Sequence, residues 1–263
     1  MKDILEEITA WKRREVEDFK RQLPERGIHA MTERMLGGNV PSLRKAVSAS
    51  DNGIIAEFKR KSPSKGWIKE SGRADVIPMA YERNGAAAVS ILTDSRFFGG
   101  DDSFVSEARR SGVTLPILYK NFITDEYQLF QARLCGASAV LLIAAVLGKD
   151  ECRTMIRTAH ELQLEVLLEM HDEYETEYAD LGPDLCGINN RNLGTFVTDV
   201  ANSVRLAPML PNDAVKVSES GISSPETIKA LRLMGYSGFL IGESFMKTGD
   251  PGAALKDFAG RAV

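Results

Sequence analysis

The sequence predicts an α/β fold, a (β/α)8 barrel preceded by a helical extension, and three observations support this prediction. Eight short apolar runs recur within residues 53–242. The stretches between them can each hold a helix and two short loops, and several carry helix-start or helix-end signals. Polar or glycine-containing segments follow the apolar runs. Side chains able to do chemistry would therefore gather at one end of the strands.

The first fifty residues differ from the rest of the chain. Residues 3–22 are rich in Glu, Lys and Arg and carry apolar side chains at near-helical spacing, which predicts a helix that ends at Pro24. A second helix is expected over residues 42–49, started by a Pro-Ser pair. We interpret residues 1–50 as a helical extension laid onto a larger body.

The remaining elements alternate regularly. Strands are expected at residues 53–58, 88–92, 116–119, 139–143, 165–170, 185–189, 215–219 and 238–242. Helices are expected at residues 101–111, 124–134, 149–161, 172–180, 199–207, 224–234 and 250–259. Such alternation favours right-handed crossovers and a parallel sheet. An open doubly wound sheet is the alternative, but no Gly-x-Gly-x-x-Gly follows the first strand. No linker divides the barrel region, so residues 1–263 are expected to form one domain.

Composition limits the partners. The net charge is −4 with both signs interspersed, which argues against a nucleic acid but leaves small anions open. Cys135, Cys152 and Cys186 are scattered, as expected for reduced thiols in a cytoplasmic protein. No signal peptide is recognisable, and no apolar run approaches the ~20 residues that a membrane span needs. We therefore expect a cytoplasmic protein without a membrane partner.

Charged residues occupy the strand ends, where they are costly unless a site needs them. Alternation places Ile55, Glu57 and Lys59 on one face of the first strand. If the other face packs on helices, Glu57 and Lys59 point into the barrel. Lys120 and Glu169 end two further strands. A basic, serine-rich loop over residues 60–66 follows the first strand, and this combination predicts an anion site.

An ordered set of motifs lies at these strand ends. It comprises Ile54–Ser64, Ser90–Asp94 with Phe97–Gly100, Leu115–Lys120, Leu168–Glu169, Gly187–Leu193, Ser218–Ile222 and Leu240–Ser244. Single pieces are weak signals, but the ordered set closely resembles the indole-3-glycerol phosphate synthase family over essentially the whole chain. One departure is visible, because the family often has Lys-Asp-Phe where this chain has Lys120, Asn121 and Phe122.

The resemblance implies a (β/α)8 barrel enzyme of tryptophan biosynthesis. The family closes the ring of 1-(2-carboxyphenylamino)-1-deoxyribulose 5-phosphate to give indole-3-glycerol phosphate, with loss of CO2 and water. The expected partner is thus a small sugar phosphate, the expected state is a monomer or weak homodimer, and no redox cofactor or metal is implied. The sequence agrees, since no cluster has metal-ligand spacing and His29, His160 and His171 are isolated.

The resemblance also implies residue roles. Lys120 resembles the principal acid, Lys59 a second lysine for anion binding and proton transfer, and Glu169 the general base. Glu57 and Glu219 are expected to orient the lysines and tune their charge. Two ammonium groups ~6 Å apart would repel by roughly 3 kcal/mol, which would lower one lysine pKa, whereas the glutamates oppose this shift. How the two lysines share the protonation steps stays open.

Further positions are expected to bind the substrate. Arg191, with Ser62 nearby, is the candidate for holding the anthranilate carboxylate, and Asn189 for orienting the substrate. The phosphate is expected at the loops after the last two strands, through Ser220, Gly221, Gly242, Glu243 and Ser244. The Glu243 carboxylate should point away from that anion. Phe97, Phe98, Leu142 and Leu193 either line the slot for the aromatic ring or pack in the core.

Two other functions stay open at this stage. A sibling barrel such as a phosphoribosylanthranilate isomerase shares the phosphate loops but typically uses a Cys/Asp pair, and such residues do not end the first and fifth strands. A phosphate-binding barrel without activity is the second alternative.

Overall fold

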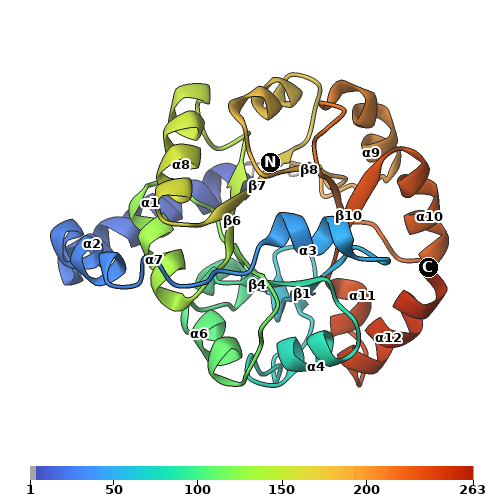
Figure 1. Cartoon of the computed structure of the whole chain (residues 1–263), viewed down its shortest axis with the longest axis horizontal. Coiled ribbons are helices and arrows are strands. Elements are labelled where there is room, and N and C mark those ends of the chain that lie inside the picture. The colour runs from blue at the N-terminus through green and yellow to red at the C-terminus, as the bar shows by residue number, and fades with distance from the viewer. Residues whose placement is uncertain (1–3, 193, 263) are drawn as a thin grey trace.

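The computed structural model describes residues 4–192 and 194–262, in which eight parallel strands close into a barrel (Figure 1). The order around the barrel is β1-β10-β9-β8-β7-β6-β5-β4. The strands are β1 Ile54–Phe58, β4 Ala88–Leu92, β5 Ile117–Lys120, β6 Ala139–Ile143, β7 Glu165–Met170, β8 Leu185–Asn189, β9 Lys216–Glu219 and β10 Tyr236–Ile241. Because all neighbours pair in parallel, the carboxyl ends meet at one face. The predicted fold class is confirmed.

Helices surround the strands and precede them. The α-helices are α1 Ile4–Gln22, α2 Glu25–Glu33, α3 Leu43–Ala49, α4 Ile77–Arg83, α5 Ser95–Phe98, α6 Ser103–Arg110, α7 Tyr127–Cys135, α8 Lys149–Glu161, α9 Ala201–Leu206, α10 Pro225–Leu233, α11 Glu243–Met246 and α12 Pro251–Ala262. Two 3-10 helices are η1 Glu175–Leu181 and η2 Ala207–Met209, and a short hairpin pairs β2 Lys61–Ser62 with β3 Gly66–Trp67. The helices expected from the sequence did not include α2, α4 or the short helices α5 and α11. Pro24 ends α1 as expected, but it also immediately precedes α2.

Side-chain alternation along β1 separates two apolar layers. Ile54, Ala56 and Phe58 belong to the large cluster between the barrel and its helices. Ile55 belongs instead to the cluster that fills the barrel interior. Glu57 has the same alternation phase as Ile55 and is buried, so the predicted inward direction of this face is confirmed.

The N-terminal helices cover both ends of the barrel. Helix α3 crosses the end nearest the viewer in Figure 1, where Leu43 and Val47 are fully buried among interior residues. Gly238 makes this contact possible, because a Cβ there would lie 2.9 Å from Val47 Cγ1. Helix α1 lies at the opposite end, where Leu5 and Ile8 line a cavity. Helix α2 projects at the left and packs on α7.

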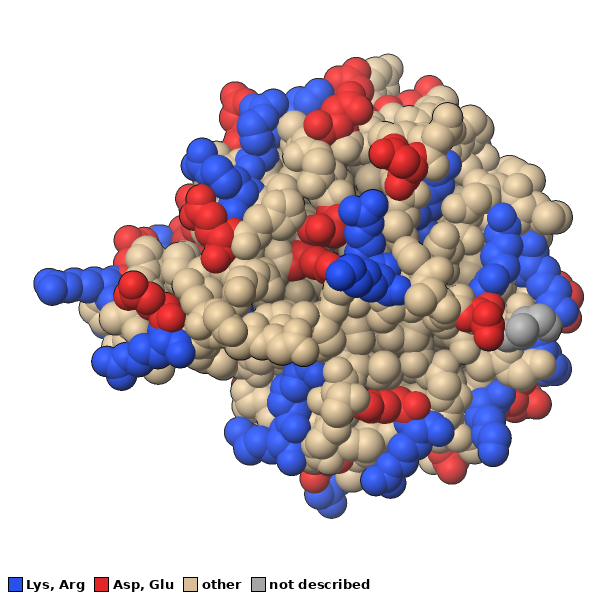
Figure 2. Space-filling model, viewed as in Figure 1, with Lys and Arg blue, Asp and Glu red and all other residues tan. Residues whose placement is uncertain are grey.

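The face in Figure 2 carries Lys and Arg side chains interspersed with Asp and Glu side chains. In the parts of the chain that the structure describes, no helix is both long and apolar enough to cross a membrane.

Candidate active site

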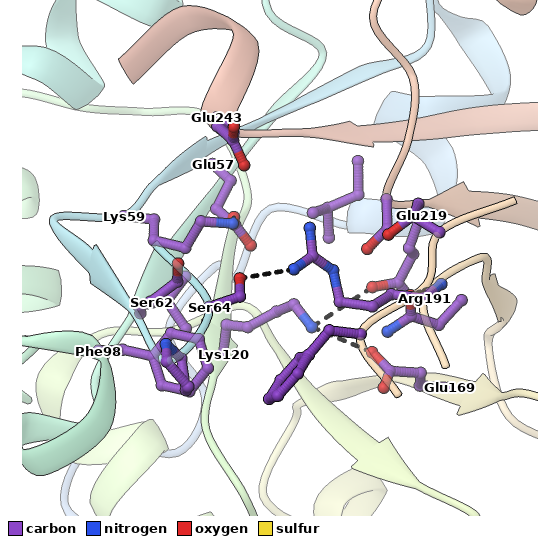
Figure 3. Close-up of a pocket in the computed structure, with 18 of the residues that line it drawn as sticks. Glu57, Lys59, Ser62, Ser64, Phe98, Lys120, Glu169, Arg191, Glu219 and Glu243 are labelled. Atoms are coloured by element: carbon purple, nitrogen blue, oxygen red, sulfur yellow. Dashed lines mark hydrogen bonds and ion pairs between the residues drawn. The ribbon is translucent and has the colours of Figure 1, made fainter. Parts of the chain in front are cut away.

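A cavity of about 660 Å³ lies at the carboxyl ends of the strands (Figure 3). Most of the predicted site residues line it, from the ends of six barrel strands and the segments that follow them. They are Glu57, Lys59, Ser62, Lys120, Glu169, Asn189, Arg191, Glu219, Ser220, Gly221, Gly242 and Glu243. Ser244 is not among the lining residues. Its hydroxyl donates to the Ile222 carbonyl at 3.3 Å and so joins the two loops after β9 and β10.

Lys120 projects between two glutamates from the opposite wall (Figure 3). Its Nζ lies 3.1 Å from Glu169 Oε2 and 3.3 Å from Glu219 Oε2. Burial lowers the pKa of Lys120, but the charges of Glu169, Glu219 and Glu57 outweigh burial and raise this pKa above its usual range. Repulsion from Lys59 therefore does not lower the pKa of Lys120 below its usual value in the free site. Lys120 is protonated, as a general acid must be.

The two glutamates beside Lys120 differ in charge state. Burial raises the pKa of Glu219 to about 8, because Lys120 only partly offsets the loss of water and the neighbouring Glu169 adds repulsion. Burial also acts on Glu169, but Lys120, His171 and Asn189 together hold its pKa well below the usual range. At neutral pH Glu169 is therefore the ionised carboxylate and Glu219 is largely protonated. Two carboxyl groups with opposite states suit acid–base chemistry.

A second pair lies at the end of β1. Lys59 Nζ is 2.5 Å from Glu57 Oε1, and both side chains are largely buried. Gly242 at the end of β10 leaves room for this carboxylate, since a Cβ there would lie 2.4 Å from Glu57 Oε1. Any other residue at 242 would displace Glu57 and with it the partner of Lys59.

Arg191 reaches across the opening of the cavity to the loop after β1. Its Nη1 donates to Ser64 Oγ at 2.8 Å (Figure 3), and its backbone N–H donates to Asn189 Oδ1 at 3.0 Å. Ser62, two residues before Ser64, is buried and lines the same cavity. The guanidinium and two serines thus stand together at the rim, where an anionic group could bind.

The loops after β9 and β10 form a second wall of the cavity. Ser220 and Gly221 adopt positive φ values of 67° and 76°. A Cβ on Gly221 would lie 2.8 Å from Thr198 Cγ2, so glycine permits this close approach. Glu243 lines the cavity. We expected its carboxylate to point away from the bound phosphate. In the structure this carboxylate lies 4.0 Å from Lys65 Nζ. The lysine opposes its negative charge.

Apolar side chains form the remaining wall. Phe98, Phe122, Leu141 and Ile143 line the cavity together with residues of α1. Of the four apolar candidates from the sequence, Phe98 lines the cavity. Leu142 instead packs outward with the helices, because alternation turns Leu141 and Ile143 inward. Phe97 contacts the Arg96 guanidinium at 5.6 Å. Leu193 lies outside the described residues.

Asn121, the departure from the usual Lys-Asp-Phe, belongs to a buried polar chain behind Lys120. Its Nδ2 donates to Thr93 Oγ1 at 2.8 Å and to the Tyr119 hydroxyl at 3.1 Å. The Tyr119 hydroxyl in turn donates to Asp102 Oδ1 at 2.7 Å. A partly buried carboxylate is thus present here, but it comes from residue 102.

Sequence reasoning missed His171. It is not isolated, because its Nε2 lies 3.2 Å from Glu169 Oε1 and its Nδ1 lies 3.2 Å from Glu175 Oε2. The available signal was alternation, since Glu169 and His171 are two residues apart at the end of β7. Across residues 4–192 and 194–262, no three His, Cys, Asp or Glu side chains are grouped so as to hold a metal ion.

A (β/α)8 barrel with paired lysines and glutamates in one cavity at the carboxyl ends of its strands is typical of an acid–base enzyme that acts on a small molecule. The model of the indole-3-glycerol phosphate synthase family matches residues 5–258. The chain belongs to this family.

Individual relatives agree with the family match. The chain is 54% identical to an indole-3-glycerol phosphate synthase from Bacteroides thetaiotaomicron over 261 residues, 98% of each protein. It is 42% identical to one from Magnetococcus marinus over 99% of each. A solved structure of 3-hexulose-6-phosphate synthase from Salmonella typhimurium matches with a TM-score of 0.63 at 14% identity, covering 80% of this chain and 98% of that one. This last likeness supports the fold alone.

Proposed function

We propose that this cavity is where the chain, as a member of its family, converts 1-(2-carboxyphenylamino)-1-deoxyribulose 5-phosphate into indole-3-glycerol phosphate, with loss of CO2 and water. This activity makes the chain a carboxy-lyase of tryptophan biosynthesis. One observation carries the assignment of residues. Lys120 lies between Glu169 and Glu219 inside a cavity that also holds the Lys59–Glu57 pair.

The two anionic ends of the substrate would bind at opposite walls. The phosphate fits the backbone of Ser220, Gly221, Gly242 and the first turn of α11, where helix geometry leaves N–H groups without helical partners. The carboxylate fits Arg191 and Ser62, because a guanidinium grips a carboxylate with two parallel hydrogen bonds. Holding both ends would bring the ring carbon against the carbonyl carbon. The apolar wall with Phe98 would accept the aromatic ring.

Lys120 would supply the acid and Glu169 the base. As the ring carbon attacks the carbonyl carbon, the oxygen receives a proton from a lysine ammonium, and the carboxylate leaves as CO2. A second protonation lets the hydroxyl leave as water, while Glu169 accepts a proton from the ring-closed intermediate. Lys59 is close enough to the cavity to share one protonation and to hold an anion, with Glu57 orienting it. Asn189 hydrogen-bonds Glu169 and would help to orient the base toward the substrate.

Turnover of the carboxyphenylamino sugar phosphate by the purified chain, followed by indole fluorescence, tests the proposal. Lys120→Ala and Glu169→Gln should each lower kcat by roughly 10²–10⁴. Lys149→Ala is the matched control, because Lys149 also pairs with a glutamate, Glu177 at 3.3 Å, but on the exposed surface. Wild-type kcat in both cavity variants would contradict the roles. A wild-type chain that cannot support growth of a tryptophan-requiring strain would contradict the activity.

We further infer a cytoplasmic monomer or weak homodimer. Cys135, Cys152 and Cys186 are free, which supports a reducing compartment. Sedimentation velocity at rising protein concentration tests the oligomeric state, and a tight dimer at micromolar concentration would contradict it.

A further inference from the structure

His171 lies between two carboxylates at the end of β7. Its Nε2 is 3.2 Å from Glu169 Oε1, and its Nδ1 is 3.2 Å from Glu175 Oε2. The backbone N–H of His171 donates to the same Glu175 oxygen at 2.6 Å. Glu175 is the first residue of η1, so η1 holds both the backbone and the ring of His171 in place. Asn202 of α9 donates to the His171 carbonyl at 3.0 Å. Three elements therefore hold this imidazole in one orientation.

Nδ1 is hydrogen-bonded to Glu175 and Nε2 lies at ion-pair distance from Glu169, so each ring nitrogen faces a carboxylate oxygen. A neutral imidazole has a single N–H, and its other nitrogen would turn a lone pair toward a carboxylate. We propose that His171 is a positioning residue, an imidazolium that holds the Glu169 carboxylate ionised and oriented for proton abstraction. This inference rests on the proposed role of Glu169 as base.

The charges around the ring agree with this state. Burial lowers the pKa of His171, but the contacts with Glu169 and Glu175 outweigh burial and raise it to about 10. Glu169 also faces Lys120, Asn189 and the largely protonated Glu219.

The second positive partner matters during turnover. Lys120 holds Glu169 Oε2, and it is also the group that gives its proton to the substrate. Once Lys120 is neutral, it no longer favours an ionised Glu169. His171 still holds Oε1, because it is fixed by Glu175 and takes no part in the transfer. Oε2 is then free to accept the proton from the ring-closed intermediate.

Nitrogen-15 NMR of the full chain measures the charge of the ring directly. The chain has only three histidines, so substitution of each assigns its signals. We expect both ring nitrogens of His171 to stay protonated at pH 8. Glu175→Gln should lower the midpoint of this titration by at least one pH unit, since a neighbouring charge shifts a pKa by about 1–3 units. A ring that is neutral at pH 8 in the wild-type chain would overturn the proposal.

Kinetics tests the effect on Glu169. His171→Asn removes the positive charge, which raises the pKa of Glu169 and moves the acid limb of kcat upward by about one pH unit. The ratio of wild-type to variant kcat should thus grow as the pH falls along this limb and be larger at pH 4.5 than at pH 8, with KM within about twofold. An equal ratio at both pH values would overturn the proposal. Should His171→Asn fail to fold, Glu175→Gln is read by the same criterion.

His160→Asn is the matched control. His160 also contacts a carboxylate, Asp184 at 2.9 Å, but on the outer face of the barrel, so its kcat should match the wild type at both pH values. A wild-type chain without turnover would contradict the proposed activity, but it would not affect the NMR result. An active chain whose kcat does not depend on His171 would contradict only the role proposed for His171.

Discussion

Lys12 of the N-terminal helix is buried against Asp94 at the end of β4, with Nζ 2.9 Å from Oδ2. The Lys12 side chain is 2% exposed and that of Asp94 is 0% exposed. The other oxygen, Asp94 Oδ1, accepts the N–H groups of Phe97 and Phe98 and so caps α5. This contact ties α1 to α5, which carries Phe98. Phe98 lines the cavity.

Lys12→Ala should lower the free energy of unfolding by about 3–5 kcal/mol, because it leaves Asp94 buried without its partner. Lys20→Ala is the control from the same helix. Lys20 pairs with Asp125 at 2.7 Å near the surface, so its loss should cost below about 1 kcal/mol. Urea unfolding measures both, and Lys12→Met combined with Asp94→Asn should recover much of the loss. Equal effects of the two lysines would refute the buried anchor.

Asn121→Asp, which restores the residue common in the family, should destabilise this chain by about 1–3 kcal/mol. The new carboxylate cannot donate to Thr93, and it competes with Asp102 for the single hydroxyl proton of Tyr119. Adding Asp102→Asn should reverse the effect, because the amide then donates to Tyr119 and Tyr119 donates to residue 121. Thermal unfolding of the double-mutant cycle checks this, and purely additive single effects would argue against it.

The stability of the chain should depend on pH through Asp102. Burial raises the pKa of Asp102 to about 6, although the Tyr119 hydroxyl opposes this shift. Between about pH 4 and 6 the folded chain holds a proton that the unfolded chain has released, so stability falls as pH rises through this window. The Asp102→Asn variant has no carboxyl group at this position, so it does not lose stability through this titration. Its unfolding free energy relative to wild type should therefore rise by at most about 3 kcal/mol from pH 4 to pH 7.

Urea unfolding at one-unit pH steps measures this difference. Asp150→Asn is a suitable control, because the Asp150 side chain is 96% exposed and its difference from wild type should stay flat. A flat difference for Asp102→Asn as well would mean that its carboxyl group titrates normally in the folded chain.

Arg191→Ala should raise KM by about 10–100-fold with a smaller change in kcat, since a charge-assisted hydrogen bond contributes about 1.5–3 kcal/mol. Ser64→Ala removes the 2.8 Å contact across the opening but keeps the guanidinium. If Arg191 binds the substrate carboxylate, Ser64→Ala should change KM only slightly. Steady-state kinetics decides, and matching KM increases in both variants would mean that Arg191 acts only by holding the loop.

The strands and their inward faces were predictable from the sequence, because Glu57 and Lys59 mark the phase of an otherwise apolar strand. In β6, Ala139–Ile143, every residue is apolar, so no polar side chain fixes the phase, and the sequence could not decide whether Leu142 lines the slot or packs in the core, where it lies. Helix α4 was missed, and Pro78 occupies its first turn, where proline is tolerated.

The contacts between distant segments could not be predicted. Lys12 and Asp94 belong to a terminal helix and a barrel loop, and no local pattern pairs them. The link from Asn121 through Tyr119 to Asp102 likewise depends on how α6 packs against β5. The sequence identified Asn121 as unusual, but only the fold supplies the carboxylate that explains it.

Helix α3 seats Leu43 and Val47 in the base of the barrel, at the end opposite the cavity. Precursor and product therefore occupy the same chamber at the carboxyl ends of the strands. Occupancy by one excludes the other, so indole-3-glycerol phosphate should act as a competitive inhibitor of its own formation. The rate of this enzyme then depends on how quickly the next enzyme removes indole-3-glycerol phosphate from solution.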